Sequence, residues 1–235
     1  MTITSSHNDK LKEIRKLARR RTREDCGRFV AEGEDLIVAA GAAGWTALTL
    51  LAAADSGLDG DEVEAELLAA VSALGSGSRQ LAVYASRWSG PTGPLCVALW
   101  GVGDPGNVGT ILRSALAFGA SSVALGPGCA DPFGPKAVRA SMGAIFQVPV
   151  ARVSALDELP GARLALVGGA GEVLRRAGTG SDGELTILVG AERDGLPAEI
   201  VAACDRVAHI PIAAESLNAA MAATVALYEL GPRDA

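Results

Sequence analysis

The chain has 235 residues, of which 49% are hydrophobic, and a formal net charge of −6. This length allows one large domain or two small ones, and the acidic total gives no overall indication of nucleic-acid binding. The four cysteines lie far apart and there are only two histidines, so neither a disulfide framework nor a metal site is predicted. The first residues lack the apolar core of a signal peptide, and no apolar run approaches membrane length. We therefore expect a cytoplasmic protein without a membrane segment.

Residues 9–23 are predicted to form a basic helix. Leu11, Ile14 and Leu17 recur at helical spacing on one face, and the other face is almost all Lys and Arg. Residues 10–28 contain nine basic residues and three acidic ones, a local surplus that the acidic total conceals. This basic run is either a solvated helix face or a surface that binds a polyanion electrostatically. Its candidate phosphate contacts are Lys12, Arg15, Lys16, Arg19, Arg20, Arg21 and Arg23.

The rest of the first ninety residues alternates between strand and helix patterns. We predict strands at 29–33, 47–53 and 80–86, helices at 34–43 and 62–74, and a flexible turn at 75–78. Such an alternation could form a small independent α/β domain over residues 1–89. The Gly- and Pro-rich residues 90–94 are the best linker in the chain.

A glycine-rich loop follows the next predicted strand, residues 95–100. Gly101, Gly103 and Gly106 match the G-x-G-x-x-G spacing of dinucleotide-binding folds, and a helix is predicted at 110–118. Pro105 removes an N–H group from the turn that would bind pyrophosphate. The following strand, 122–125, ends without an acidic residue to bind a ribose. An NAD-binding oxidoreductase is therefore a disfavoured alternative.

Arg113 lies on that predicted helix among Ile, Leu, Ala and Phe residues. A cation on so apolar a helix needs a partner or a ligand. From this stretch alone, a structural ion pair and a functional site are both open.

The second half of the chain also alternates between helices and strands. We predict a helix at 137–145, which carries Arg139 and Ser141, and strands at 147–150, 163–167 and 185–189. The last two strands run into Gly168 and Gly190. Ligands bind at such strand ends in open α/β sheets. A further helix is predicted to open at Pro197.

The C-terminal stretch is a strand at 207–212, a polar loop and a long apolar helix at 217–230. Ser216 is predicted as the helix N-cap, and Gly231 and Pro232 end the helix. Asn218 is out of place in the first turn, because a buried amide must find hydrogen-bond partners. It is either a second capping residue or part of a site.

Three motifs then occur in order along the chain. They are Asn107-x-Gly109-x-x-x-Arg113, Leu188-Val189-Gly190-x-Glu192-x-x-Gly195-Leu196, and Ile210-Pro211-Ile212 followed by Ser216-Leu217-Asn218. With Asp131-Pro132-Phe133 and residues 139–144 between them, they resemble the SpoU (TrmH-like) family of RNA 2′-O-ribose methyltransferases in the SPOUT superfamily. This resemblance covers about residues 95–230. More loosely, residues 10–36 resemble the ribosomal-protein-like RNA-binding domain that often precedes the catalytic domain.

The resemblance implies a fold and a domain division. It implies an α/β fold in which a small N-terminal α/β RNA-binding domain (1–89) and a linker (90–94) precede a SPOUT-type α/β domain (95–235). That second domain would have a mostly parallel sheet and a C-terminal trefoil knot, which general rules of chain topology would not predict.

The resemblance also implies the site residues and the cofactor, S-adenosylmethionine. The cofactor-binding residues would be Gly168, Gly190, Ile210, Leu217 and Asn218. The catalytic set would be Arg113, Asn107, Glu192, Ser216 and Asn218, with Arg113 activating the ribose hydroxyl. Because a guanidinium is almost never deprotonated, Arg113 could instead hold the phosphate and stabilise the developing alkoxide.

The implied function is methyl transfer to a ribose 2′-hydroxyl in RNA by a homodimer without metal. Ribosomal RNA of the large subunit is favoured over tRNA because an N-terminal RNA-binding unit is present. Arg139 joins the predicted RNA contacts. The alternative of a different class, a non-catalytic RNA-binding module, would not need Arg113 and Asn218 in apolar helices.

Overall fold

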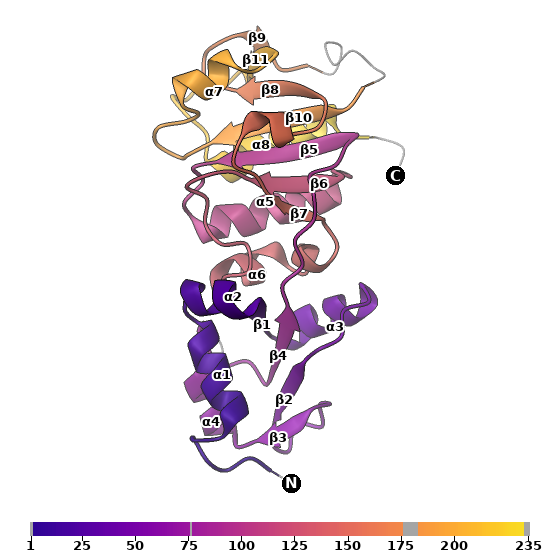
Figure 1. The fold of residues 1–235 in the computed structure, drawn as a ribbon, viewed down its shortest axis with the longest axis vertical. Helices are drawn as coiled ribbons and strands as arrows, with labels where there is room; N and C mark the ends of the chain where they lie inside the picture. Colours follow the sequence, from indigo (N-terminus) through magenta and orange to yellow (C-terminus); the bar gives the residue numbers. More distant parts are fainter. Residues whose placement is uncertain (1, 76, 176–182, 233–235) are drawn as a thin grey trace.

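The computed structural model describes residues 2–75, 77–175 and 183–232, which form two β-sheets one after the other along the chain (Figure 1). The first sheet has the order β1-β4-β2-β3, with β4 antiparallel to both neighbours and β2 parallel to β3. We call residues 2–85 the N-terminal unit. Its elements are α1 (Asp9–Leu17), α2 (Arg20–Cys26), β1 (Arg28–Glu32), α3 (Glu34–Ala42), β2 (Thr49–Ala53), β3 (Asp61–Val63), α4 (Ala65–Val71) and β4 (Gln80–Ala85).

The second sheet has the order β7-β6-β5-β10-β8-β11-β9, and every pairing in it is parallel. We call residues 95–232 the C-terminal unit. Its strands are β5 (Leu95–Trp100), β6 (Ser122–Leu125), β7 (Val150–Arg152), β8 (Ala162–Leu166), β9 (Glu172–Val173), β10 (Leu185–Gly190) and β11 (Arg206–His209). Its helices are α5 (Pro105–Ala117), α6 (Pro135–Ser141), α7 (Ala198–Ala202) and α8 (Ala219–Leu230), with short 3₁₀ turns η1 (Ala144–Phe146) and η2 (Leu156–Glu158). The expected α/β class with a mostly parallel sheet is confirmed.

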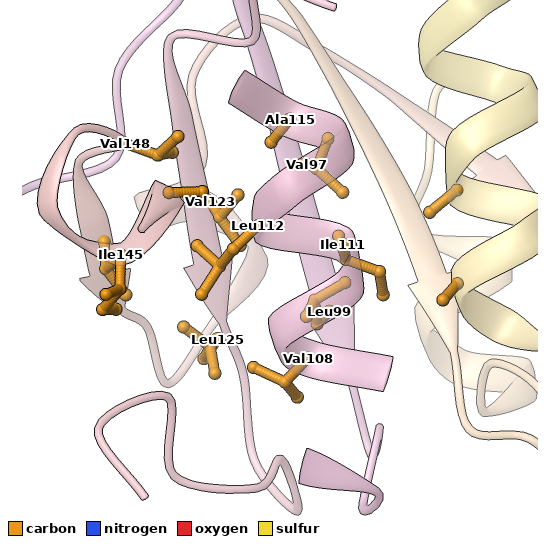
Figure 2. Packing of buried hydrophobic residues seen from close by; sticks show 14 of the residues in the cluster. Val97, Leu99, Val108, Ile111, Leu112, Ala115, Val123, Leu125, Ile145 and Val148 are labelled. Atoms are coloured by element: carbon orange, nitrogen blue, oxygen red, sulfur yellow. The ribbon is translucent and has the colours of Figure 1, made fainter. Parts of the chain in front are cut away.

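Helix α5 is the central helix of the C-terminal unit. Asp104 caps its start by accepting a hydrogen bond from the Asn107 N–H at 2.9 Å, and Pro105 occupies the first turn, where a missing N–H costs nothing. Ile111 and Leu112 pack on alternate residues of β5 and β6 (Figure 2). Gly109 lets α6 approach, because a Cβ there would lie 2.3 Å from the Ala137 carbonyl oxygen.

The sheet of the N-terminal unit is buried on both faces, because β1 and β4 are nearly continuous apolar runs whose successive side chains point to opposite faces. Val30, Leu81 and Val83 point to the face covered by α1 and α4. Phe29 and Tyr84 point to the opposite face and belong to the same buried cluster as the core of the C-terminal unit. The apolar core therefore runs from one sheet to the other without a break.

Aromatic rings fill this junction between the two units. Phe29 lies 4.9 Å from Phe133 between ring centroids, and Tyr84 lies 5.2 Å from Phe146. The Trp45 indole N–H donates to the Phe146 carbonyl oxygen at 2.7 Å. Since buried aromatic contacts of this kind dominate interface energetics, the two units are held in a defined arrangement.

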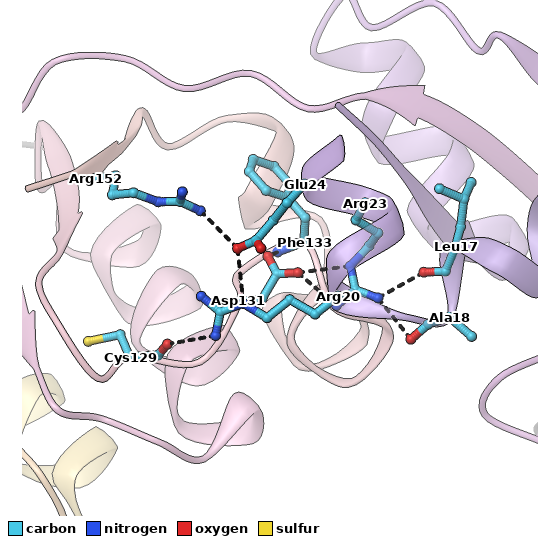
Figure 3. A network of polar contacts seen from close by, with 9 residues as sticks. All are labelled: Leu17, Ala18, Arg20, Arg23, Glu24, Cys129, Asp131, Phe133 and Arg152. Atoms are coloured by element: carbon cyan, nitrogen blue, oxygen red, sulfur yellow. Dashed lines mark hydrogen bonds and ion pairs between the residues drawn. The ribbon is translucent and has the colours of Figure 1, made fainter. Parts of the chain in front are cut away.

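A buried ion pair lies beside the aromatic cluster (Figure 3). Arg23 and Asp131 are 2.7 Å apart, and their side chains are 7% and 9% exposed. The Arg23 guanidinium also donates to the Leu17 and Ala18 carbonyl oxygens at 2.8 and 2.9 Å. Through these bonds, Arg23 connects the end of α1 to the β6–α6 loop.

This contact explains why the prediction of one helix over residues 9–23 is wrong. The chain forms α1 and α2 instead, because Arg19 adopts an extended conformation with φ −90° and ψ 130°. The carbonyl groups that the break exposes are satisfied by Arg23. The hydrophobic period of α1 gives no sign of this long-range contact.

Two other predicted helices are interrupted, and two predicted strands are shorter or shifted. Residues 137–145 form α6 and then η1, separated by Met142 and Gly143 with φ of 49° and 88°. Residues 61–63 pair with β2 as strand β3 before α4 begins. Strand 147–150 is found at β7, three residues later, and strand 207–212 ends at His209. The predicted turn at 75–78 includes Ser76, which lies outside the described residues.

In the described parts of the chain, no helix is both long and apolar enough to cross a membrane. Threading of the C-terminal segment through a loop stays a prediction.

Candidate active site

The carboxyl ends of the parallel strands place several of the predicted site residues at one edge of the sheet. Strands β8, β10 and β11 are followed by the loops that begin at Val167, Ala191 and Ile210. Neighbouring parallel strands end at the same edge, so these loops lie together there.

A cavity of about 310 Å³ opens between these loops. Four of the five predicted cofactor-binding residues line it, and so do two residues of the predicted catalytic set. These six residues are Gly168, Gly190, Ile210 and Leu217 from the first set, and Glu192 and Ser216 from the second. Its other lining residues are Leu166, Val167, Val189, Ala191, Arg193, Asp194, Gly195, Ile212, Glu215, Ala219 and Ala222.

The backbone of this cavity has free hydrogen-bonding groups. Among the described residues, neither Gly168 nor any residue from 210 to 217 takes part in a backbone–backbone hydrogen bond. Buried or ligand-facing backbone groups normally find partners in secondary structure or in a ligand. The cavity wall therefore offers N–H and C=O groups that a polar ligand can use.

Two glycines shape the loop after β10. The Ala191 and Gly195 backbones exchange hydrogen bonds of 3.1 and 3.0 Å, so the chain turns back on itself within five residues. Gly195 has φ of 67°, which favours glycine, and a Cβ at Gly190 would lie 2.2 Å from the Gly195 carbonyl carbon. These requirements explain both glycines of the second motif and fix the position of Glu192.

A chain of side-chain hydrogen bonds connects the three motifs. The Asn218 Nδ2 group donates to Asn107 Oδ1 at 3.0 Å, and the Asn107 Nδ2 group donates to Glu192 Oε1 at 2.6 Å. Asn107 therefore links the start of α5 to the start of α8 and to the cavity wall at Glu192. The structure brings together residues up to 111 positions apart in the sequence.

Asn218, and not Ser216, is the N-cap of α8. Its Oδ1 atom accepts hydrogen bonds from the Ala220 and Met221 N–H groups at 2.9 and 3.3 Å. The prediction that Ser216 caps this helix is wrong, because the helix begins two residues later than expected. The interpretation of Asn218 as a capping residue is therefore confirmed. Its Nδ2 group is bonded to Asn107, and a role for Asn218 in a site stays a prediction.

Arg113 is exposed on α5 and lies outside the lining of the cavity. Its side chain has no hydrogen bond or ion pair with any described residue. The structural ion pair that the sequence left open is not found among the described residues, because Thr110, Arg113 and Leu116 form an exposed stripe at helical spacing. In the described structure, the guanidinium remains available to a ligand.

The predicted RNA contacts fall into two groups. Six of them lie on α1, on α2 or between these two helices, and their side chains reach solvent. Four of the six have a hydrogen-bond or ion-pair partner. Lys12 pairs with Asp9, Arg15 donates to the Ser6 carbonyl, Arg20 pairs with Glu24, Arg21 lies 3.8 Å from Asp25, and Lys16 and Arg19 have no side-chain partner among the described residues.

The other two basic residues belong to the junction between the units. Arg23 is buried against Asp131, and its guanidinium also donates to the Leu17 and Ala18 carbonyl oxygens. Arg139 on α6 pairs with Asp35 on α3 at 3.0 Å and is partly exposed.

Sequence reasoning missed the charged lining of the cavity. Asp194 and Glu215 join Glu192 there, against the single cation Arg193. In the sequence, only two positions could have pointed to these carboxylates: Asp194 follows a buried strand, and Glu215 directly precedes the Ser216-Leu217-Asn218 segment. In the described residues, no group of His, Cys, Asp or Glu side chains could hold a metal ion.

The loop that matches G-x-G-x-x-G does not offer a pyrophosphate site. The Asp104 carboxylate occupies the N-terminus of α5, where a dinucleotide would place its phosphates. A second anion there would be repelled, so the structure gives the NAD alternative no support.

Comparison with known proteins agrees with this geometry. Residues 94–228 match the model of the SpoU rRNA Methylase family, and residues 8–83 match the MRM3-like substrate binding domain. The chain is 29% identical to the 23S rRNA (guanosine(2553)-2′-O)-methyltransferase RlmP of Bacillus subtilis, over 97% of this chain and 98% of that protein.

Two solved structures are similar along nearly the whole chain. The AdoMet-bound rRNA methyltransferase from Sinorhizobium meliloti has a TM-score of 0.85 and 31% identity, covering 97% of this chain and 96% of that one. The SpoU methyltransferase AviRb from Streptomyces viridochromogenes, in complex with AdoMet, has a TM-score of 0.83 and 27% identity, covering 95% and 97%. With the three motifs joined at one edge of a parallel sheet, this chain belongs to the SpoU rRNA methylase family.

Proposed function

We propose that this protein transfers a methyl group from S-adenosylmethionine to a ribose 2′-hydroxyl in ribosomal RNA. The observation that carries the proposal is the cavity with free backbone groups at the ends of β8, β10 and β11, joined by the Asn218–Asn107–Glu192 chain to helix α5. The family membership and the AdoMet-bound relatives support it.

The cavity suits this cofactor in size and in charge. Its volume of about 310 Å³ lies in the range of about 300–1,000 Å³ found for small-molecule sites. Glu192, Asp194 and Glu215 outnumber Arg193 in its lining, which favours a cationic ligand over the diphosphate of NAD. S-adenosylmethionine supplies, when bound, a methyl group on a positively charged sulfonium. Gly168, Gly190, Ile210 and Leu217 would hold its polar groups through the backbone.

Arg113 would act on the RNA. As a permanent cation without a protein partner among the described residues, it would bind the phosphate next to the target ribose and stabilise the charge that develops on the 2′-oxygen. Solvent or a phosphate oxygen takes the proton, because a guanidinium does not. Asn107 and Glu192 would fix the ends of the loops around the reacting groups.

The N-terminal unit would bind the RNA. We propose that residues 1–89 are the substrate-binding domain, 90–94 the linker and 95–235 the catalytic domain. The match of residues 8–83 to a substrate-binding domain supports this division. The relatives that align along nearly the whole chain are named for ribosomal RNA, which favours this substrate, in the large subunit, over tRNA. Such a protein would work in the cytoplasm with the ribosomes.

The protein would be a homodimer. Helices α5 and α8 pack together, with Ser114 and Thr224 hydroxyls 2.7 Å apart, and expose four large apolar side chains. These are Leu116, Met221, Val225 and Tyr228, which are 39%, 61%, 40% and 58% exposed. These side chains would form the dimer interface. Light scattering at micromolar concentration should give twice the chain mass, and a monomer would refute the dimer.

Calorimetry on the purified protein tests the cofactor. It should bind S-adenosylmethionine, or the demethylated product, and show no binding of NAD above background. The reverse result would end the methyltransferase proposal.

A matched pair of glycine variants tests the position of the cofactor. Gly168 lines the cavity, has no atom within 4 Å of an added Cβ and needs no left-handed backbone. Gly168→Leu should therefore fold and lower the affinity for S-adenosylmethionine at least about tenfold, a loss of about 1.4 kcal/mol. Gly41→Leu, equally open but on α3, is the control and should bind like wild type.

A further inference from the structure

A second cavity, of about 450 Å³, lies at the junction of the two units. Its walls come from α2, the segment after β4, the β6–α6 loop and the end of β7. It is lined by Arg20, Trp88, Leu125, Gly126, Pro127, Gly128, Cys129, Ala130, Asp131, Pro132, Arg152, Val153, Ser154 and Glu158. We call it the junction groove. Neither the proposed cofactor nor the catalytic set uses it.

Trp88 is held at the mouth of this groove while part of its ring stays in solvent. The next residue, Ser89, pairs with β7: its N–H donates to the Val150 carbonyl oxygen at 2.9 Å. The Trp88 ring meets Phe133 edge-on at 5.1 Å, and the residue is still 40% exposed. An indole fixed in this way presents a rigid, partly exposed aromatic surface on which a flat ligand can stack.

Arg152 extends the aromatic surface. Its guanidinium carbon lies 4.5 Å from the centroid of the Trp88 ring, and its side chain is 56% exposed. Glu24 orients two arginines around the groove (Figure 3): its Oε1 atom lies 3.0 Å from Arg20 Nε and 3.5 Å from Arg152 Nη2. The hydrogen bond from Arg20 lowers the pKa of Glu24 below its ordinary value, so this carboxylate stays charged beside both arginines.

The charge of the junction groove distinguishes between two parts of RNA. Its lining has two cations, Arg20 and Arg152, and two carboxylates, Asp131 and Glu158. A phosphate site needs a surplus of cations, which this lining lacks. Unpaired bases instead stack on aromatic rings and guanidinium planes.

We propose that the junction groove binds an unpaired nucleobase of the RNA substrate, stacked on the Trp88–Arg152 pair. This proposal rests on the proposed function, because it takes RNA as the substrate. It adds a base-binding site to the charged RNA contacts that are proposed on α1 and α2.

The position of the groove connects the basic helices with the catalytic set. The loop that forms its floor is hydrogen-bonded to the β5–α5 loop, by Ala130 N–H to the Val102 carbonyl and Gly101 N–H to the Pro127 carbonyl, both at 2.9 Å. Arg20 also lines a neighbouring cavity of about 350 Å³ with Gly103, Pro105 and Lys136. A strand whose base occupies the groove would thus pass the start of α5, two residues before Asn107.

Two substitutions separate stacking from packing. Trp88→Phe keeps an aromatic face, and Trp88→Leu keeps an apolar contact with Phe133 but has no aromatic face. The probe is a short single-stranded RNA without self-complementarity, and the same RNA annealed to its complement is the comparison. Leu48→Ala, which truncates an exposed apolar side chain outside the groove, is the control.

Trp88→Leu should weaken binding of the single strand at least about fivefold, the lower end of the loss for one stacked base. It should leave the salt dependence of binding and the affinity for S-adenosylmethionine unchanged. Trp88→Phe and Leu48→Ala should bind like wild type, and the duplex should be insensitive to all three changes. Equal single-strand binding by Trp88→Leu and wild type would overturn the base site while leaving the proposed function intact. A wild-type protein that binds neither RNA would overturn both.

Discussion

Asn218 uses both ends of its side-chain amide. The oxygen caps α8, and the nitrogen donates to Asn107 in the first motif. The sequence pointed to this residue because an amide at the start of an apolar helix is unusual. It could not show that the two roles coincide, because the second depends on a partner 111 residues away.

Variants of Asn218 should separate these roles. Asn218→Asp retains the capping oxygen but cannot donate to Asn107, so we expect near wild-type stability and a marked loss of methyl transfer. Asn218→Ala loses both, and should also destabilise the protein by about 1 kcal/mol. Thermal unfolding and a methyl-transfer assay measure the two effects. If Asn218→Asp is fully active, the amide serves only as a cap.

Arg113 should be required for chemistry and not for folding. Because its side chain is exposed and has no partner among the described residues, Arg113→Ala should keep the fold and most of the cofactor affinity. Methyl transfer should fall at least about a hundredfold, the scale of losing one positioned catalytic group. Arg113→Lys keeps the charge but not the two-pronged geometry and should recover only part of the rate. Wild-type turnover by the alanine variant would remove Arg113 from the site.

Helices α1 and α2 present the positive charge that the acidic total conceals. Of their exposed arginines, Arg20 and Arg21 are paired with Glu24 and Asp25 within α2, while Arg19 has no such partner among the described residues. Exposed pairs of this kind are weak, so a phosphate can compete for the arginines. The surplus charge acts only locally, because salt screens exposed charges beyond roughly 10 Å.

Replacing Arg19, Arg20 and Arg21 together with Ala should reduce the salt dependence of RNA binding. The slope of log affinity against log salt should flatten by up to about three phosphate contacts, and all RNAs should weaken similarly. Cofactor affinity should not change. Arg79→Ala, which removes an exposed arginine paired with Glu34 elsewhere on the N-terminal unit, is the control. An unchanged slope in the triple variant would mean that these arginines are only solvated surface.

The sequence predicted elements best where local pattern alone decides them. Strands β5 and β6 were predicted with the bounds observed, 95–100 and 122–125, because each is a short apolar run between turn residues. The break between α1 and α2 was missed because Arg23, held by Asp131 in the other unit, stabilises it. The interruption of α6 was missed because Met142 adopts a backbone conformation that is rare for a residue with a side chain.

The candidate site was predicted through the resemblance more than through pattern. Glycines at strand ends indicated where a ligand would lie, and four of the five predicted cofactor-binding residues do line the cavity. Its carboxylate-rich lining, Asp194 and Glu215 with Glu192, was not foreseen. Exposed loops carry no hydrophobic period, so only the folded chain brings these side chains together.

At the scale of the whole molecule, the two units share one core and one buried ion pair. Asp131→Ala would leave the Arg23 charge buried without its partner, so we expect the free energy of unfolding to fall by about 3–5 kcal/mol. The double variant Arg23→Met, Asp131→Ala also removes the unpaired buried charge of Arg23, and it should be less destabilised than the single Asp131 variant. Chemical denaturation measures both. A single variant as stable as wild type would show that the pair does not support the junction.

The most direct test of the proposed activity is methyl transfer to ribosomal RNA. Purified protein would be incubated with methyl-labelled S-adenosylmethionine and with 23S ribosomal RNA from cells that lack this protein. The labelled nucleotide would then be identified. We predict that the label appears on a ribose 2′-oxygen, which protects the following phosphodiester from alkaline cleavage, and that Arg113→Ala transfers almost none. Label on a base, or no label in ribosomal RNA while the protein still binds the cofactor, would contradict the proposed function.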